Sequence, residues 1–268
     1  MNYKLLVVDI DGTLVGKAGV ISREDKMALA AAQRAGVRVS LSTGRASQGC
    51  RWVIEELSLD GYHVFFDGAL VAGPEKDVYV EPLAGDVVEE VVDFVRENDI
   101  YLELYSATDY FVERENWATE IHRKYFKLEP RVVDFKGLGS EERFVKGGLI
   151  TRDEAEVIQA KSFRNRFDHS LRFSVAQSPA YPGVEFINVL APEVSKGKAL
   201  TALASHLGVS LREVVAVGDG SNDISLLSVA GLAVAMGNAS DEVKAVAHHV
   251  TDDVTNNGVA AVIERFLL

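Results

Sequence analysis

Residues 5–13 read LLVVDIDGT, an apolar run that stops at two aspartates separated by one residue, with a glycine behind them. Apolar residues without polar alternation are typical of a strand buried on both faces, as in a parallel sheet. Asp9 and Asp11 would then stand at the carboxyl end of this strand, where open parallel sheets bind their ligands. This stretch therefore predicts an α/β fold and marks its first candidate site.

The chain on either side of that strand alternates helical and apolar patterns. Before position 82 we expect a helix from Ser22 to Gly36, a strand at 37–41, a helix at 46–57 and a strand at 64–66. After position 190 we expect a helix from Ser195 to Gly208, strands at 214–217 and 232–235, and helices at 223–229, from Ser240 and at 258–268. Strands that alternate with helices need crossover connections, which produce a parallel sheet. Residues 1–82 and 190–268 are therefore predicted to form one Rossmann-like, doubly wound parallel sheet core.

Residues 83–189 have a different pattern. Expected strands at 101–105 and 110–112, and again at 171–175 and 184–189, follow one another without an intervening helix. Because strands adjacent in sequence favour antiparallel pairing, we predict an inserted α+β domain here. Most of its aromatic residues are expected to pack in its core, namely Tyr101, Tyr105, Tyr110, Phe111, Trp117, Tyr125 and Phe126.

The composition narrows the class of protein. The 268 residues carry 40 acidic against 28 basic side chains, a net charge of −12, which disfavours binding to nucleic acid or to an anionic membrane. No stretch approaches the ~18–20 apolar residues of a membrane span. The single cysteine, Cys50, excludes an internal disulfide and a zinc site built from cysteines. We expect a soluble, cytoplasmic protein; its oligomeric state is left open.

Two acidic clusters follow predicted strands of the core. Asp9 and Asp11 are two positions apart, so on an extended backbone their carboxylates share one small volume. Two carboxylates this close together repel each other unless a cation neutralises them or one of them takes up a proton. The stretch 218–223, GDGSND, presents Asp219, Asn222 and Asp223 at another strand end. These oxygen ligands suit Mg²⁺, although Asp, Asn and Gly are also common in solvated turns.

Two further stretches suit an anion. Thr43 offers a hydroxyl, Gly44 a close backbone approach and Arg45 a cationic fork, directly before a predicted helix whose N–H groups point the same way. Lys196 opens another predicted helix, where a cation has the wrong sign for the helix dipole unless an anion compensates it. Alternatively, the first stretch is a polar turn and the lysine is solvated. All of these groups are expected at one edge of the sheet: the two acidic clusters, the hydroxyl and the lysine. Their convergence favours a ligand-binding site over isolated turns and a solvated lysine.

In their order along the chain, DIDGTL, STGR, SKGKAL and GDGSND resemble the haloacid dehalogenase superfamily, specifically its Cof-type sugar-phosphate phosphatases with a large inserted cap. The resemblance covers both core segments. It implies that Asp9 is the nucleophile and Asp11 the general acid and base. It also implies that Thr43 and Lys196 hold the transferring phosphoryl group, and that Mg²⁺ is bound by Asp9, the Asp11 backbone carbonyl and Asp219. Asn222 and Asp223 match the remaining acidic-loop positions, Asn222 as a substrate contact and Asp223 as a metal ligand.

The function predicted on this basis is Mg²⁺-dependent hydrolysis of small phosphate monoesters, such as sugar phosphates, through an aspartyl-phosphate. Thr43, Gly44, Arg45, Lys196 and Asn222 would contact the phosphorylated metabolite. Two alternatives stay open at this point. A phosphomutase would return the phosphoryl group to its substrate, and a regulator would bind a phosphorylated ligand without turnover. The physiological substrate is not determined, because the cap carries no recognisable code.

Overall fold

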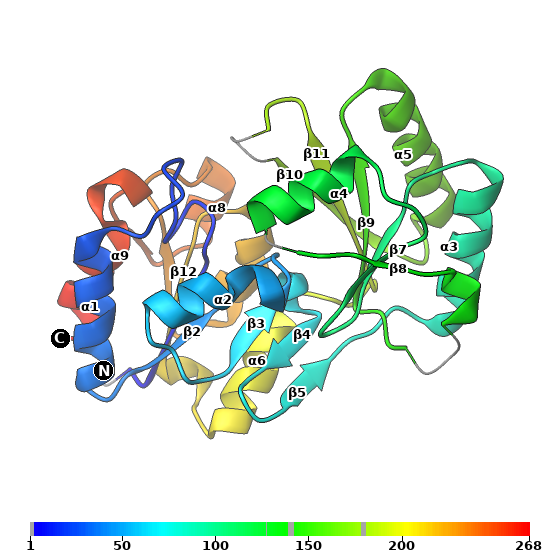
Figure 1. Ribbon diagram of the computed structural model, residues 1–268. Helices are drawn as coiled ribbons and strands as arrows, with labels where there is room; N and C mark the ends of the chain where they lie inside the picture. Colours follow the sequence, from blue (N-terminus) through cyan, green and yellow to red (C-terminus); the bar gives the residue numbers. More distant parts are fainter. Residues whose placement is uncertain (1–2, 127, 139–141, 178–180) are drawn as a thin grey trace. The chain divides into compact units, whose positions relative to one another are not determined.

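The computed structural model of the protein describes residues 3–126, 128–138, 142–177 and 181–268, with the side chains of 125, 126, 176 and 177 left out (Figure 1). The chain forms two units. The first comprises the chain up to Arg45, Cys50–Val80 and Ser195 onward, and the second comprises Ala46–Gly49 and Glu81–Val194.

A parallel sheet forms the centre of the first unit. Its strand order is β14-β13-β12-β1-β2, and every pairing is parallel. The strands are β1 (Leu5–Val8), β2 (Arg38–Leu41), β12 (Val214–Gly218), β13 (Leu232–Ala235) and β14 (His249–Val250). All four residues of β1 are fully buried, as its uninterrupted apolar run predicts. Strand β1 lies between β12 and β2, so Asp9 emerges at the carboxyl end of an interior strand of the sheet.

Helices connect these strands and cover the sheet. They are α1 (Arg23–Arg34), α2 (Ser47–Glu56), α6 (Lys196–Leu207), α7 (Ile224–Val229), α8 (Asp241–Ala245) and α9 (Gly258–Phe266). The predicted caps are present, because Ser22, Ser195 and Ser240 each accept a backbone hydrogen bond in the first turn of their helix. Helix α1 packs against α9 (Figure 1). Helix α6 packs against α7. The predicted Rossmann-like, doubly wound core is confirmed.

One predicted strand of the core belongs to a different sheet. Strand β3 (His63–Phe65) pairs antiparallel with β4 (Leu70–Ala72), and β4 pairs antiparallel with β5 (Asp77–Val80). An isolated bridge between Ser42 and Val64 joins β3 to the chain that leaves β2. We expected a strand at 64–66 within the parallel series, and we did not predict β4 or β5. The turn at 73–76, GPEK, allows the chain to reverse so that β4 and β5 pair locally.

The second unit is built on a largely antiparallel sheet with the strand order β10-β11-β9-β6-β7-β8. Its strands are β6 (Glu103–Tyr105), β7 (Tyr110–Val112), β8 (Arg131–Val132), β9 (Lys146–Thr151), β10 (Arg172–Gln177) and β11 (Glu185–Leu190), and its helices are α3 (Gly85–Glu97), α4 (Trp117–Ile121) and α5 (Glu154–Phe167). Only β7 and β8 pair in parallel among the described strands of this sheet. The predicted α+β insertion is confirmed.

Aromatic side chains fill much of this second unit. Helices α3 and α5 lie side by side, with Phe94 of α3 against Phe163 and Phe167 of α5 (Figure 1). Of the aromatic residues expected in the core, Tyr105, Tyr110 and Phe111 are buried, whereas Tyr101 and Trp117 are partly buried. The side chains of Tyr125 and Phe126 lie outside the described residues.

Candidate functional site

The first strand of the parallel sheet delivers Asp9 and Asp11 to its carboxyl edge. The Asp9 N–H donates to Val217 O of β12 at 3.0 Å, so the chain leaves the sheet directly after this residue. Asp9 is buried, whereas the Asp11 side chain is 57% exposed. Gly12 turns the chain with φ +91°, and a Cβ there would lie 2.2 Å from Asp219 Oδ2. Only glycine lets the backbone approach that carboxylate so closely.

Lys196 lies at the centre of the site. It is the first residue of α6, and its side chain is 0% exposed. Its Nζ donates to Asp9 Oδ1 at 2.6 Å, to Asp223 Oδ1 at 2.6 Å and to Ser42 O at 3.1 Å. Burial disfavours the ammonium, but the charges of Asp223 and Asp9 outweigh it and raise the Lys196 pKa above its ordinary value. The lysine that stands at the unfavourable end of a helix dipole is therefore held there by carboxylates.

The loop after β12 brings two more carboxylates to the lysine. Asp223 Oδ2 accepts from the backbone N–H groups of Asp219 and Gly220, which fixes its side chain inside its own turn. Asp219 Oδ1 accepts from the Thr13 hydroxyl at 2.8 Å. In the described part of the chain, Asp9, Asp219 and Asp223 each offer a carboxylate oxygen within 4.8 Å of the others. We call these three residues the carboxylate cluster.

The single positive charge of Lys196 does not balance the three carboxylates of the cluster. Burial raises the pKa of Asp9 well above its ordinary value; Lys196 opposes the shift, and Asp223 and Asp219 add to it. Burial likewise raises the pKa of Asp219 to about 6, against the hydrogen bond from Thr13. Ionised carboxylates this close and this deeply buried need a further cation. An all-oxygen donor set of this kind fits a hard divalent ion such as Mg²⁺.

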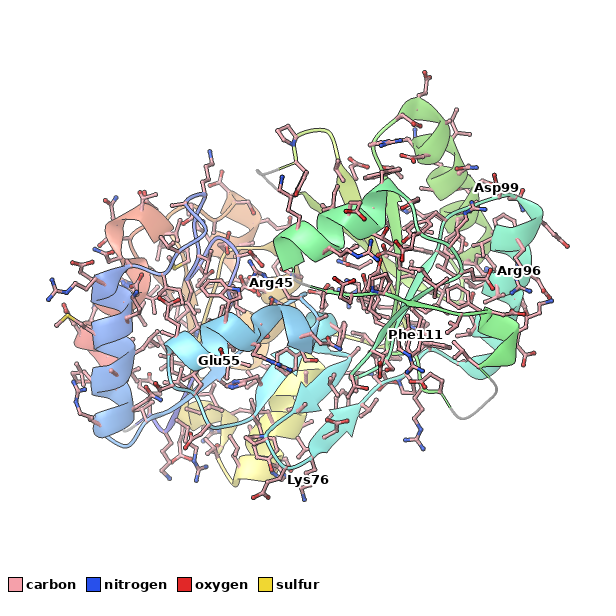
Figure 2. All side chains as sticks on the ribbon, viewed as in Figure 1. Arg45, Glu55, Lys76, Arg96, Asp99 and Phe111 are labelled. Atoms are coloured by element: carbon pink, nitrogen blue, oxygen red, sulfur yellow. The ribbon has the colours of Figure 1, made fainter. Side chains whose placement is uncertain are left out.

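The loop after β2 places Thr43, Gly44 and Arg45 beside this cluster. The Thr43 hydroxyl accepts from the Arg45 N–H at 3.1 Å, and Thr43 is almost completely buried. Arg45, labelled in Figure 2, points its guanidinium at Asp11 and donates to both carboxylate oxygens, Nε at 2.8 Å and Nη2 at 2.6 Å. Such a two-bond fork suits a carboxylate or a phosphate equally.

The structure thus brings the sequence-predicted residues to one edge of the parallel sheet, with one difference inside the set. Asp9, Asp219, Asp223 and Lys196 form one connected group. The Asp11 carboxylate is paired with Arg45 instead of joining the carboxylate cluster. Asn222 Nδ2 donates to Asp67 Oδ1 at 2.8 Å, and Asp67 is a residue for which we predicted no role.

We predicted no role for Thr13, Asp67 or Asn238 from the sequence, although Thr13 lies in the first candidate stretch. Asn238 follows β13, and its Nδ2 donates to Gly12 O at 2.9 Å and to Asp219 Oδ2 at 3.2 Å. These contacts span more than the local sequence, so no spacing rule indicates them. Asp67 is the exception, because an Asp-Gly pair directly after a predicted strand repeats the pattern of Asp11 and Gly12.

Comparison with known proteins agrees with this geometry. A family model described as haloacid dehalogenase-like hydrolase matches residues 6–263. Phosphatase YwpJ of Bacillus subtilis is 28% identical over 98% of this chain and 100% of its own length. The 5-amino-6-(5-phospho-D-ribitylamino)uracil phosphatase YcsE of the same organism is 28% identical over 100% of this chain and 97% of its own length. A crystal structure from Thermotoga maritima matches with a TM-score of 0.86 at 25% identity, covering 98% of this chain and 97% of that chain.

The chain belongs to the haloacid dehalogenase-like hydrolase family. It is an enzyme of the phosphatase class within that family, which confirms the prediction made from the four sequence stretches. Among the described residues, no helix combines the length and the apolar character needed to cross a bilayer.

Proposed function

We propose that the protein hydrolyses small phosphate monoesters, with Mg²⁺, through a phosphorylated Asp9. The arrangement around Lys196 carries the proposal: a fully buried ammonium contacts Asp9 and Asp223 at 2.6 Å each, beside the further carboxylate of Asp219. Phosphate monoesters resist hydrolysis so strongly that enzymes supply up to ~10²¹-fold acceleration. Much of the difficulty is charge, since an anionic nucleophile must approach an anionic phosphate.

Asp9 is the group we assign to the attack. Lys196 binds its Oδ1, which orients the carboxylate and leaves Oδ2 for phosphorus. The Asp9–phosphorus bond forms as the bond from phosphorus to the leaving alkoxide breaks. Water then attacks the same phosphorus, the Asp9–phosphorus bond breaks, and inorganic phosphate is released. Splitting one difficult displacement into two easier ones is the advantage of a covalent intermediate.

Asp11 is the group we assign to proton transfer. It donates a proton to the leaving alkoxide in the first step and accepts one from water in the second. In the structure its carboxylate is held by Arg45, so this pair has to open before Asp11 can donate. A phosphate dianion suits the same guanidinium fork. We infer that substrate binding at Arg45 releases Asp11 for its role.

The remaining residues hold the phosphoryl group and the cation. We assign three donors to phosphoryl oxygens: the Thr43 hydroxyl, the Gly44 backbone N–H and the Asn222 amide. Lys196 already donates to Asp9, Asp223 and Ser42, so we assign it the role of supplying positive charge beside the phosphoryl group. Asp9, Asp219 and Asp223 would hold Mg²⁺, with the Asp11 backbone carbonyl as a further proposed ligand; when bound, the ion neutralises charge on the phosphoryl oxygens.

The substrate we propose is a free, phosphorylated metabolite of the cytoplasm, such as a sugar phosphate. The resemblance to Cof-type enzymes supports this class, as does the phosphorylated ribityl group in the name of one relative, the Bacillus subtilis phosphatase YcsE. The net charge of −12 disfavours phosphate groups on nucleic acids or membranes as targets.

The test is phosphate release from p-nitrophenyl phosphate and a panel of sugar phosphates, with Mg²⁺ and after chelation. We expect free phosphate that depends on Mg²⁺. An isomerised phosphosugar without free phosphate would identify a mutase instead. Tight binding of a phosphorylated ligand without turnover would identify a regulator and end the proposal.

A further inference from the structure

The turn after β3 has an unusual backbone. Phe66, Asp67 and Gly68 all have positive φ, at 53°, 55° and 105°. Side chains with a Cβ disfavour this left-handed region, which is why such conformations persist only where surrounding contacts enforce them. Phe66 is fully buried and Asp67 is almost so, although aspartate is ordinarily exposed. Asp67 is therefore both buried and held in a disfavoured backbone conformation, which indicates a specific role for its side chain.

This turn is attached to the loop that carries Thr43 and Arg45. The Phe66 N–H donates to Arg45 O, and the Asp67 N–H donates to Thr43 O, both at 3.0 Å. A Cβ on Gly44 would lie 2.9 Å from Asp67 Oδ1, so the carboxylate rests directly against that backbone. These contacts therefore fix the position of the proposed phosphate-binding loop, residues 43–45, at the edge of the sheet.

The Asp67 carboxylate also determines how Asn222 is oriented. Asn222 Nδ2 donates to Asp67 Oδ1 at 2.8 Å. A carboxylate only accepts hydrogen bonds, so it selects the orientation in which the amide NH₂ faces it. A primary amide has two N–H donors, and this bond uses one of them. The second N–H then has a defined direction, as a donor to a phosphoryl oxygen requires.

The same turn approaches the start of α6. A Cβ on Gly68 would lie 2.3 Å from Ser195 O, a contact that only glycine allows. The negative charge of Asp67 also acts on Lys196 and favours its ammonium form. The turn at 66–68 thus contacts the loop of Thr43, the loop of Asn222 and the helix start that bears Lys196.

We propose that Asp67 is a positioning residue for phosphoryl transfer, which fixes the Asn222 amide and the Thr43 loop so that both donate to the phosphoryl group. This inference rests on the proposed function, since Asn222 and Thr43 act on a phosphate only if the enzyme binds one. Asp67 itself does not contact the phosphate. Its carboxylate acts through Asn222, whereas its backbone N–H holds the Thr43 loop and is retained in Asp67→Gly. Removing such a supporting residue typically lowers activity or affinity by ~10–100-fold.

The test is a double-mutant cycle with Asp67→Gly and Asn222→Ala. Glycine removes the carboxylate yet tolerates φ +55°, so the loss is not confused with backbone strain. Asp67→Asn keeps an acceptor and a residue that also tolerates this region, and we expect it to recover most of the loss. Asp77→Ala, an exposed aspartate of β5 in the same sheet, is the matched control and should behave as the unaltered protein.

Two readouts separate this inference from the proposed function. Turnover of p-nitrophenyl phosphate tests the enzyme, and calorimetric binding of inorganic phosphate with Mg²⁺ tests the site even where turnover is absent. We expect Asp67→Gly to weaken phosphate binding or turnover ~10–100-fold, and to have little further effect in the Asn222→Ala protein. Multiplicative losses in the double variant, an Asp67→Asn protein as impaired as Asp67→Gly, or no phosphate binding by the unaltered protein would each overturn it.

Discussion

Each unit of the molecule buries a group of ionisable side chains, and the two groups differ in how their charge is compensated. In the first unit, the carboxylate cluster of Asp9, Asp219 and Asp223 faces the ammonium of Lys196. In the second unit, Glu103 is 2% exposed and accepts hydrogen bonds at both carboxylate oxygens. Its donors are Tyr105, Tyr110 and His122.

The pKa directions follow from that difference. Burial would raise the pKa of Glu103, but His122 and the hydrogen bonds from the two tyrosines reverse the effect and lower it. Burial raises the pKa of Asp9, and Lys196 does not reverse it because neighbouring carboxylates act in the same direction as burial. A buried carboxylate such as Glu103, whose hydrogen bonds and charge are compensated by neighbouring side chains, stabilises the fold. A cluster with more carboxylates than cations instead indicates a site that binds a ligand.

The largest effect expected from this contrast is the loss of activity in Asp9→Asn. An amide cannot attack phosphorus, so we expect phosphate release to fall at least ~10³-fold while the protein stays folded. The matched control is Glu103→Gln, which also neutralises a buried carboxylate. A comparable loss of turnover in that control would break the contrast between the two groups.

Stability should respond in the opposite way. Glu103→Gln leaves His122 and the tyrosines without their carboxylate, so we expect the inserted domain to lose about 2–3 kcal/mol in its free energy of unfolding. Urea unfolding followed by tyrosine and tryptophan fluorescence measures this. Glu97→Gln, at the exposed end of α3, should change little. Equal stabilities for the two variants would show that the buried carboxylate is not supporting the fold.

Added Mg²⁺ should stabilise the first unit through the carboxylate cluster. At a concentration tenfold above the dissociation constant, the expected gain in unfolding free energy is ~1.4 kcal/mol. Asp219→Asn removes a proposed ligand and should shrink the shift in thermal midpoint, while Glu103→Gln should leave the shift intact. A shift of equal size in all three proteins would place the ion elsewhere.

A smaller effect is expected from a third buried group, His63 of β3. Burial lowers its pKa to about 4 from 6.5, and its Nε2 has no hydrogen-bond partner among the described residues. Between these values the unfolded chain binds more protons, so stability is fully present above pH 6.5 and is lost as the pH falls toward 4. The slope is at most ~1.4 kcal/mol per pH unit. His63→Asn keeps an acceptor for the Leu41 N–H, and its stability should vary less with pH; identical slopes would contradict the assignment.

Much of the core and of the candidate site was predictable because the information is local. Apolar runs that end in Asp9 or at Gly218 define strand ends, and serine caps such as Ser195 define helix starts. Carboxyl ends of parallel strands meet at one edge, so residues far apart in sequence were correctly expected to converge. The antiparallel β3–β5 sheet was not predictable in the same way, since its short strands have no marked alternation.

The fine geometry of the site depends on contacts that no local pattern encodes. The sequence places Asp11 beside Asp9, but the guanidinium of Arg45 decides where its carboxylate points. Asn238 reaches Gly12 across more than two hundred residues of chain. Such contacts depend on packing between elements, which a spacing rule along one strand or helix does not capture.

The most direct test of the central claim is to find the phosphoryl group on the protein. The enzyme would be quenched in acid during turnover of a phosphate monoester, and the phosphorylated peptide would be identified by mass spectrometry. We predict a single phosphoryl group on Asp9, absent from Asp9→Asn. Turnover with the phosphoryl group on another residue, or with no covalent intermediate at all, would contradict this mechanism.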